Sequence, residues 1–423
     1  MATFDLLDLN LSDPSGEALL AAVAGRHGVA IAQAAKFAER LFLMRSSWAP
    51  SLCFVGGQAH PARLDERYAD LPALSFAGAG EDPETALTAC VGECVERLSQ
   101  VERPADLCCT SSSSEIHERL LPGLLPLLAD ARAEVGFDEH RALDWVEGRA
   151  LLTAEPVLVP ADWCLRRPKG VSKLKPRGAL STGAAAGRTL EMAMERALLE
   201  LVERDAVGLW WRGGRRGRPL PMASPAFQKG MELVRALRQA RTDRSSWFLD
   251  LTTDMAVPTV AAVSFDSGGR GFACGFAARV DLGDAIRAAV FEMMLMELGY
   301  LLAKAKQESL GESALNEGDR MHLRRSTMID KETCDLVHPS GAPLTGSAPS
   351  SGSPFSVLRA AFAQSGFDVG MVDLTRDEFA IPVVFALAPA LQPMPSSLAT
   401  PRLRSTLAAT GHDARMTSDV ALL

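Results

Sequence analysis

One short pattern occurs twice in the sequence and constrains the fold more than any other feature. Residues 92–97 read Gly-Glu-Cys-Val-Glu-Arg and residues 199–204 read Leu-Glu-Leu-Val-Glu-Arg, so the shared positions recur 107 residues apart (93 to 200, 96 to 203). Two glutamates three residues apart lie on one face of a helix, where like charges repel. The flanking side chains are mostly apolar, which indicates that each helix is largely buried. The sequence therefore predicts two long, buried helices that carry paired carboxylates.

Paired carboxylates in a buried setting need a cation, because an uncompensated charge is costly to remove from water. The two pairs, Glu93 with Glu96 and Glu200 with Glu203, can jointly hold hard divalent cations through oxygen. The arginine that ends each motif suits phosphate oxygens. No Gly-x-x-x-x-Gly-Lys-Ser/Thr segment supplies a competing phosphate site. The residues alone thus indicate a nucleotide–magnesium site, and the alternative is that they form ordinary helix salt bridges.

Strands and helices alternate along the chain, which predicts an α/β (α+β) fold with mixed sheets and long helices. The expected helices are 84–100, 107–132, 189–211, 285–305 and 360–373, and the expected strands are 51–55, 73–77, 151–160, 247–251, 257–265, 272–276 and 381–387. A chain of 423 residues is long enough for two or three domains. We expect a small α/β lead-in over residues 1–74, a main domain over 75–400 and a tail over 401–423.

The charge balance argues against several classes of partner. The net charge is −8, which disfavours a general nucleic-acid or anionic-membrane surface. The first residues carry acids where a signal peptide would carry Lys or Arg. No run of about 18 uncharged apolar residues is present to span a membrane. We therefore expect a cytoplasmic protein that binds neither nucleic acid nor membranes.

The ordered series of motifs resembles the YcaO family over roughly residues 75 to 400. The first match is the glycine turn 78–80 followed by residues 89–97. The strongest match is the block 181–205, which starts Ser-Thr-Gly-Ala-Ala-Ala-Gly-Arg-Thr-Leu-Glu and ends Leu-Glu-Leu-Val-Glu-Arg-Asp. Shorter matches agree with it at 275–279, 291–298 and 381–396. The resemblance implies a YcaO-like catalytic domain over residues 75–400.

The resemblance implies an ATP- and Mg2+-dependent cyclodehydratase or thioamide-forming enzyme. Such an enzyme phosphorylates an amide oxygen of a ribosomal precursor peptide after a nucleophile has attacked the amide carbon. A Cys, Ser or Thr side chain then gives an azoline, a backbone amide gives an amidine, and sulfide gives a thioamide. The metal ligands implied are Glu93, Glu96, Glu200 and Glu203. The phosphate or nucleotide contacts implied are Arg97, Ser181, Thr182, Arg188, Glu191 and Arg204.

The resemblance also implies partner proteins. The lead-in is too short for a convincing leader-binding domain, so we expect a leader-binding partner protein or a TfuA-like protein to deliver the precursor peptide. A flavin dehydrogenase and a second copy in a homodimer are further candidates.

The motifs depart from the usual pattern of the family at five positions. The usual lysine of the glycine turn is Ala79, the usual serine of the first helix is Ala89, and two usual asparagines are Thr182 and Arg188. The usual glutamine of the third helix is Leu295. This loss motivates a second hypothesis, a non-catalytic nucleotide-binding scaffold subunit, and a third hypothesis is a structural protein whose glutamates form salt bridges. Because the four glutamates are intact, we favour an active enzyme.

Two basic loops, residues 166–177 and 212–218, flank the strongest match. Their prolines and glycines exclude a regular helix. Either they are solvated loops, or they attract an acidic leader peptide or the triphosphate.

The tail ends in the apolar residues Val420, Leu422 and Leu423 after a polar stretch. Each large side chain gains about 1.5–3 kcal/mol when fully buried. Many members of the family place a terminal carboxylate in the active site. We therefore hypothesise that the tail docks inward and that the carboxylate of Leu423 acts there as a base or organiser, and the alternative is that the tail stays outside the cleft.

Overall fold

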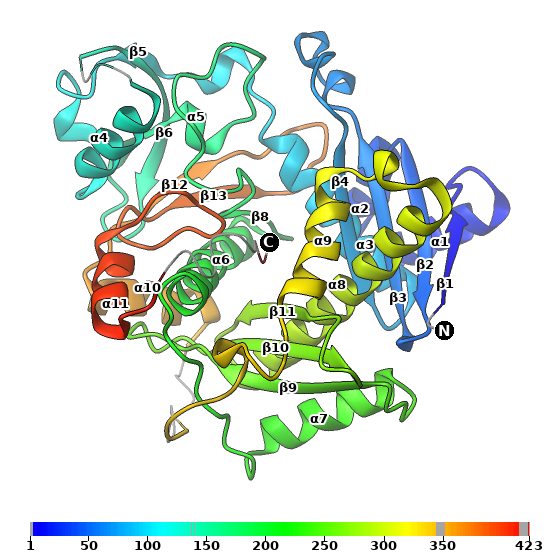
Figure 1. The fold of residues 1–423 in the computed structure, drawn as a ribbon. Coiled ribbons are helices and arrows are strands. Elements are labelled where there is room, and N and C mark those ends of the chain that lie inside the picture. The colour runs from blue at the N-terminus through cyan, green and yellow to red at the C-terminus, as the bar shows by residue number, and fades with distance from the viewer. Residues whose placement is uncertain (1–2, 137, 139, 344–351, 414–421, 423) are drawn as a thin grey trace.

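The structure is a computed structural model that describes residues 3–136, 138, 140–343, 352–413 and 422 (Figure 1). Its strands are β1 (Phe4–Asp8), β2 (Arg40–Ser46), β3 (Ala49–Ala59), β4 (Leu74–Gly80), β5 (Cys109–Ser111), β6 (Leu143–Ala150), β7 (Pro156–Pro160), β8 (Ala184–Ala186), β9 (Arg244–Asp250), β10 (Thr259–Asp266), β11 (Ala273–Ala278), β12 (Gly370–Asp373) and β13 (Val383–Leu387). Its α-helices are α1 (Pro14–His27), α2 (Val29–Ala34), α3 (Pro83–Ser99), α4 (Leu124–Val135), α5 (Ala161–Cys164), α6 (Leu190–Trp211), α7 (Pro225–Leu237), α8 (Leu282–Leu310), α9 (Glu317–Met328), α10 (Pro354–Ser365) and α11 (Pro401–Thr410). The expected fold class, α/β (α+β), is confirmed.

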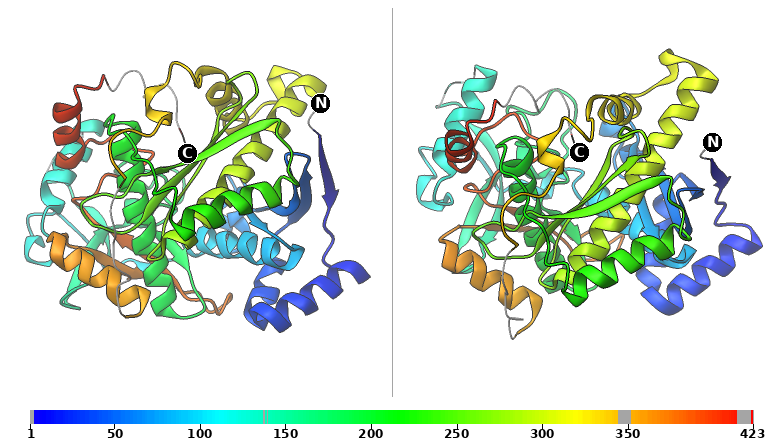
Figure 2. Two further views of the ribbon diagram at one scale, coloured as in Figure 1. Left: turned by 90° about the horizontal axis from the view of Figure 1, so that it is seen from below. Right: turned by 60° about the horizontal axis from the view of Figure 1, so that its bottom comes forward.

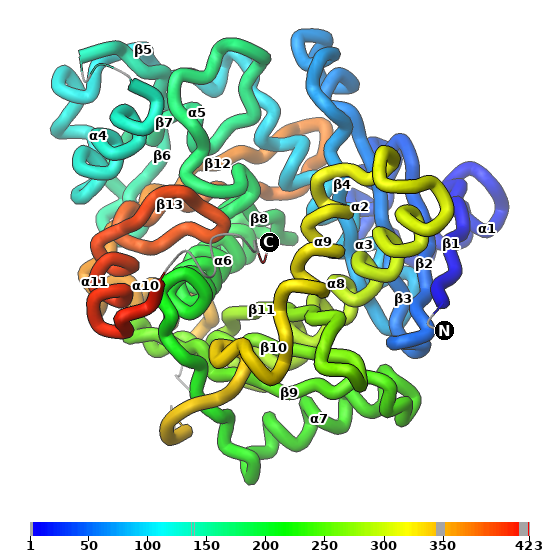
Figure 3. Tube along the Cα trace, viewed as in Figure 1, coloured from blue at the N-terminus to red at the C-terminus, as the bar shows by residue number. Residues whose placement is uncertain are grey.

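The structure has three sheets, and helix α6 lies near the centre of the view, packed on β8 and β13 of one sheet and on β11 of another (Figure 1). The first sheet has the order β1-β2-β3-β4, the second β11-β10-β9, and the third β5-β6-β12-β13-β8 with β7 paired to β6. The ladders among the described residues are antiparallel, as in the pairing of β13 with β8. Figure 2 shows the second sheet with α7 along one face, and Figure 3 follows the chain from α8 into α9.

Three units, each a strand followed by a helix, share the same arrangement. The helices α3, α6 and α8 begin after the N-cap residues Asp82, Thr189 and Asp281, whose side chains each accept a hydrogen bond from a backbone N–H of the first turn. Each helix packs on the strand before it, namely β4, β8 or β11. Each also contacts the strand of the next unit, because α3 touches β8, α6 touches β11 and α8 touches β4. The two sequence motifs therefore belong to two structurally equivalent units, and β11 with α8 forms a third such unit.

Two glycines show how closely the first two units correspond. Gly80 and Gly187 stand 107 residues apart, at the end of β4 and just after β8. A Cβ atom at Gly80 would lie 2.6 Å from the backbone nitrogen of Ala86, and one at Gly187 would lie 2.4 Å from that of Ala193. Both positions therefore exclude any side chain, because the strand end lies directly against the first turn of its helix.

The lead-in shares its sheet and its core with the following residues. Strand β4, which crosses the expected boundary after residue 74, pairs with β3 along the whole of its length. Buried side chains on both sides of that boundary, such as Val23 and Leu87, belong to one apolar cluster. The lead-in is thus built into the wall of the molecule beside α3.

Several expected elements differ in extent from the observed ones. Residues 151–160 were expected to form one strand, but the strand is Pro156–Pro160, and its partner β6 was not expected. The expected helix 107–132 is much shorter, because residues 109–111 form β5 and α4 begins only after Gly123. The expected helix 360–373 is α10, which ends at Ser365 because Gly366 adopts φ 67°, followed by strand β12.

The basic loops are only partly solvated: Lys169, Lys175 and Arg216 are exposed, whereas other cations of the loops are engaged inside the protein. Arg167 is buried and forms ion pairs with Glu102 at 2.5 Å, Asp144 at 2.8 Å and Asp162 at 2.9 Å. In the second loop, Arg215 is half-buried and donates to the backbone carbonyls of residues 251 and 252. These arginines are engaged inside the protein and cannot attract a peptide as free surface charges. No helix among the described residues is long and apolar enough to span a bilayer.

Candidate functional site

The first glutamate of each unit is fixed to its own unit. Glu93, Glu200 and Glu292 each stand eleven residues after the N-cap of their helix. Glu93 accepts a hydrogen bond from the backbone N–H of Ala77 at 2.8 Å, and Glu292 accepts one from Phe276 at 2.6 Å. Glu200 accepts a longer one, 3.3 Å, from the N–H of residue 183, just before β8. The three carboxylates therefore take equivalent places on three helices.

The second glutamate of a unit reaches the strand of the next unit. Glu96 of α3 accepts a 2.8 Å hydrogen bond from the N–H of Ala186 in β8, and Glu203 of α6 accepts a 3.3 Å bond from Ala278 in β11. Ala186 is the last residue of β8 and Ala278 is the last residue of β11, and each lies three residues before the N-cap of the helix that follows. The two alanines therefore occupy equivalent positions. The pairs thus link the three units through two polar junctions.

The third junction, between α8 and β4, is apolar. The position on α8 equivalent to Glu96 and Glu203 is Leu295, and the position on β4 equivalent to Ala186 and Ala278 is Ala79. Leu295 and Ala79 both pack against the same apolar cluster. Two of the departures from the family pattern, at Ala79 and Leu295, therefore border the same apolar cluster.

Burial perturbs the carboxylates of the two polar junctions. It raises the pKa of Glu96 to about 8, and the neighbouring charge of Glu200 adds to this rise. Burial raises the pKa of Glu200 to about 7, with a further contribution from Glu203. Burial also raises the pKa of Glu203, and it raises that of Glu292 to about 7, where the charge of Glu203 contributes. The acids crowd together without enough positive charge to offset burial.

The arginines satisfy only some of these carboxylates. Arg97 donates to Glu93, and Nη2 of Arg204 lies 3.3 Å from Glu200 and 3.6 Å from Glu203. The salt bridges of the alternative interpretation therefore exist, but within the described residues no ion pair reaches Glu96. Nε and Nη1 of Arg204 are buried and have no hydrogen-bond partner there. The site thus contains a carboxylate without an ion pair, that of Glu96, and guanidinium nitrogens without acceptors, those of Arg204.

This donor set fits Mg2+ together with phosphate. No three acidic, histidine or cysteine side chains of the described part of the chain lie close enough together to hold a metal ion alone. Mg2+ usually binds through one or two carboxylates and completes its shell with water and substrate phosphates. Partly buried carboxylates with raised pKa values suit such a cation, and the unpartnered nitrogens of Arg204 suit a phosphate oxygen. Glu93, Glu96, Glu200 and Glu203 remain the predicted ligands, and Glu292 joins them.

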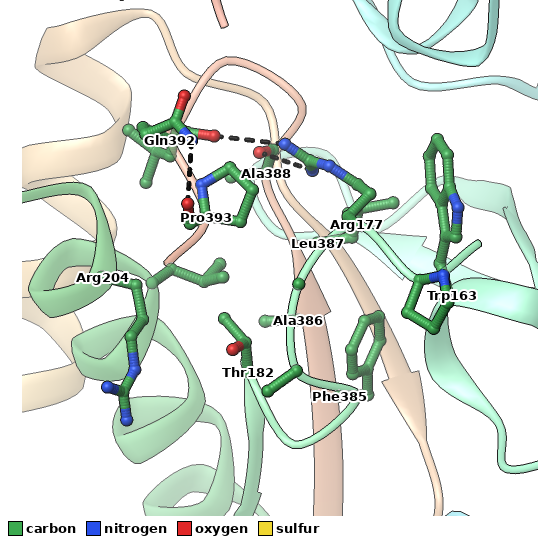
Figure 4. A pocket seen from close by; sticks show the side chains of 15 residues that line it. Trp163, Arg177, Thr182, Arg204, Phe385, Ala386, Leu387, Ala388, Gln392 and Pro393 are labelled. Carbon is green, nitrogen blue, oxygen red and sulfur yellow. Dashed lines mark hydrogen bonds between the residues drawn. The ribbon is translucent and has the colours of Figure 1, made fainter. Parts of the chain in front are cut away.

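A pocket adjoins the arginine of the second unit (Figure 4). Its cavity is narrow, about 30 Å3, and lies between α6, the loop before β8 and the loop after β13. Arg204 and the buried Arg177 line opposite sides of it in this view, with Thr182 between them. Arg177 donates to the carbonyls of residues 388 and 391, and no acidic side chain belongs to the described lining. The pocket is therefore positively charged on two sides.

Four of the predicted nucleotide contacts lie in the second unit, either before β8 or around the start of α6. Ser181 and the buried Thr182 lie in the turn before β8, and Thr182 faces the pocket. Arg188 and Glu191 are exposed around the start of α6. Leu423 lies outside the described residues, so its catalytic role stays a prediction. The adjacent Leu422 is fully buried, and its carbonyl accepts a hydrogen bond from Arg325 of α9.

Glu292 was not predicted as a site residue. The sequence contains Glu292 but has Leu295 and Met296 where the other motifs have Glu and Arg, so the pattern does not repeat. Its distance of eleven residues from an Asp N-cap, equal to that in α3, is a signal that could have identified it.

The chain is also similar to known proteins. A family model described as YcaO cyclodehydratase, ATP- and Mg2+-binding, matches residues 77–392. An uncharacterised protein in the tfuA 3′ region of Rhizobium leguminosarum bv. trifolii is 31% identical over 197 residues. The match covers 44% of this chain and 44% of that protein, so the chain aligns with less than half of that relative's length.

Two solved structures share the fold. A heterocyclase in complex with substrate and cofactor superimposes with a TM-score of 0.68 at 20% identity, over 91% of this chain and 55% of that chain. The YcaO protein of Methanopyrus kandleri, bound with AMPPCP and Mg2+, superimposes with a TM-score of 0.56 at 22% identity, over 84% of this chain and 86% of that chain.

Proposed function

The chain belongs to the YcaO family, and its cofactors are ATP and Mg2+; from this premise we propose that it activates a backbone amide of a ribosomal precursor peptide by O-phosphorylation. The product is an azoline, a thioamide or an amidine, according to the nucleophile. One observation carries the proposal: partly buried glutamates with raised pKa values from three helices adjoin an arginine with unpartnered donors.

In the proposed reaction, bonds form and break at one amide. The nucleophile adds to the amide carbon, and the resulting oxyanion takes the γ-phosphoryl group of ATP, releasing ADP. That oxygen then leaves as phosphate while the carbon forms a double bond to nitrogen or sulfur. Mg2+ supplies charge neutralisation for the phosphates when it is bound. Phosphoryl transfer depends mostly on positioning and charge neutralisation, which is the chemistry that these side chains offer.

We assign roles to the residues as follows. Glu93, Glu96, Glu200, Glu203 and Glu292 hold the cations. Arg97 and Arg204 neutralise phosphate oxygens, because a guanidinium donates to two oxygens in a fixed geometry. Ser181, Thr182, Arg188 and Glu191 border the nucleotide along the start of α6. The peptide then approaches from the side of the pocket that Arg177 and Thr182 line.

Each possible product goes with a different kind of partner protein. A relative is encoded in a tfuA 3′ region, which supports a TfuA-like partner and sulfide as the nucleophile. The likeness to a heterocyclase supports a leader-binding partner and an azoline instead. We propose that a partner delivers the peptide in either case.

Reconstitution tests the proposal. The chain is incubated with ATP, Mg2+, and the peptide and partner encoded by neighbouring genes, with and without sulfide, and the peptide is analysed by mass spectrometry. Loss of one water indicates an azoline or amidine, and exchange of oxygen for sulfur indicates a thioamide. Glu203→Gln should abolish the change, whereas Glu232→Gln, at an exposed position of α7, should not. An unchanged peptide in every mixture, with ATP bound, would instead support the second function.

That second function is a nucleotide-binding scaffold subunit. The apolar junction of Leu295 with Ala79 favours it, because one of three equivalent positions has lost its polar side chain. The intact carboxylates of the other two junctions favour catalysis, and we therefore place it second.

A further inference from the structure

The C-terminal end of helix α1 lies against the start of the second unit. His27, the last residue of α1, lies outside the matched family region 77–392. Its Nδ1 is 3.4 Å from Nη2 of Arg188, the residue before the N-cap of α6. The neighbouring Arg26 forms a 2.7 Å ion pair with Asp82, the N-cap of α3. The end of α1 therefore bridges the starts of two of the repeated units.

The contact with Arg188 fixes the tautomer of His27. A guanidinium only donates hydrogen bonds, so Nδ1 must accept and the ring proton must sit on Nε2. Burial lowers the pKa of His27, and the charges of Arg26 and Arg188 lower it further, so the ring is neutral at pH 7. Nε2 therefore carries a single N–H that is free to donate.

That donor is buried and has no acceptor. Nε2 of His27 is inaccessible to solvent and has no hydrogen-bond partner among the described residues. A buried donor without a partner costs about 1–3 kcal/mol, so such groups usually meet an acceptor from a ligand or from water. The position of His27 indicates which ligand could supply it.

The distance along α6 separates this donor from the metal-binding carboxylates. Glu200 stands eleven residues after Thr189, which corresponds to about 16 Å along a helix. If the triphosphate lies at the carboxylates, the group beside Arg188 and His27 is the other end of an extended nucleotide, the nucleoside.

We propose that His27 is a nucleotide-binding residue whose Nε2–H donates a hydrogen bond to the nucleoside part of ATP. This inference rests on the proposed function, since it assumes ATP at the carboxylates of α3 and α6. Arg188 positions the imidazole ring. The lead-in thus supplies a residue to the nucleotide site, and Arg188, which replaces a usual asparagine, has a partner that compensates for the change.

Titration calorimetry on matched variants tests the inference. His27→Gln keeps an N–H near the place of Nε2, whereas His27→Asn keeps one only near the place of Nδ1. We expect His27→Ala and His27→Asn to weaken Mg·ATP binding about tenfold, the equivalent of one net hydrogen bond, and His27→Gln to restore most of the affinity. Inorganic tripolyphosphate with Mg2+ should bind all four proteins equally, because it has no nucleoside. His117→Ala, at an exposed histidine, is the control.

Thermal melting of the ligand-free variants excludes a purely structural effect, since removing a buried unpartnered donor should leave the melting temperature unchanged or raise it. Unaltered ATP affinity in His27→Ala, combined with lost affinity in Glu203→Gln, would overturn this inference and leave the proposed function intact. Equal weakening of ATP and tripolyphosphate would also overturn it. Absence of ATP binding by the unmodified chain would overturn both.

Discussion

The three junctions between the repeated units have the same backbone geometry but different chemistry. At the junctions of α3 with β8 and of α6 with β11, a glutamate crosses to a backbone N–H of the next strand. At the junction of α8 with β4, the equivalent positions are Leu295 and Ala79, which pack in an apolar cluster. The comparison teaches that changes at distant sequence positions can belong to one place in the fold, where they compensate each other.

Helix α8 also shows that a buried acid alone does not indicate a site. Glu297, five residues after Glu292, is 1% exposed and bonds Arg238 at 2.7 Å and Arg244 at 2.9 Å. These arginines lower the pKa of Glu297 even though burial opposes them. No ion pair reaches Glu292 among the described residues, and burial raises its pKa to about 7 although the charges of Arg204 and Arg279 oppose the rise. Glu297, whose charge is paired, stabilises the fold, whereas Glu292, which has no ion pair, is available to a ligand.

The largest expected effect separates Glu297 from the junction glutamate Glu203 by their contributions to stability. Glu297→Gln leaves two buried guanidinium groups without their anion, and we expect it to lower the free energy of unfolding by about 3–5 kcal/mol. Glu203→Gln should leave that free energy unchanged or raise it in the absence of nucleotide, because it relieves a crowded acid. Urea unfolding of both variants checks this. A large loss in Glu203→Gln would show that the junction acids are structural salt bridges.

The next effect concerns nucleotide affinity. Glu96→Gln and Glu203→Gln each remove a carboxylate from a polar junction, and we expect Mg·ATP to bind about a hundredfold more weakly, or about 2.7 kcal/mol. Calorimetry with and without Mg2+ measures this, with Glu232→Gln as the control. Full affinity in both variants would refute the glutamate site.

The pH dependence of stability should reveal the same acids. In the folded state Glu96 has a pKa of about 8 and Glu200 and Glu292 of about 7, all above their unfolded values. The folded chain then binds more protons than the unfolded chain between about pH 5 and 8, so stability must fall as pH rises through that window. Melting temperatures of the ligand-free protein should decline over this range, and saturating Mg·ATP should flatten the decline. A rise toward pH 8 would contradict the raised pKa values.

The smallest expected effect is at the apolar junction. Leu295→Gln places a polar group against the apolar cluster, and we expect a loss of about 1 kcal/mol in stability with less than a fivefold change in ATP affinity. Melting and calorimetry on the same sample measure both. A gain of tenfold or more in affinity would show that the third junction also faces the nucleotide.

The sequence predicted the two carboxylate helices well because their motif repeats and their caps are local. The helices expected to start at residues 84 and 189 are α3 and α6, which follow the N-cap residues Asp82 and Thr189. The third unit was missed because its second glutamate and arginine are gone, and only its spacing from Asp281 remains.

Burial of the basic loops could not be predicted from their composition. The partner of Arg167, Glu102, lies 65 residues away in the sequence, and local charge patterns carry no information about such a contact. The role of His27 likewise depends on a contact with Arg188, which is 161 residues away. Local signals fix helix starts, whereas charge partners depend on tertiary packing.

The anchoring of Leu422 gives the protein a built-in optical reporter. Its side chain belongs to the apolar cluster that contains Trp210 and Trp211 at the end of α6, the helix that carries Glu200 and Glu203. Release of Leu422 would admit water to these indoles, and their emission would shift to longer wavelength. The intrinsic fluorescence of the unlabelled protein should therefore report whether this residue stays seated while nucleotide and peptide bind.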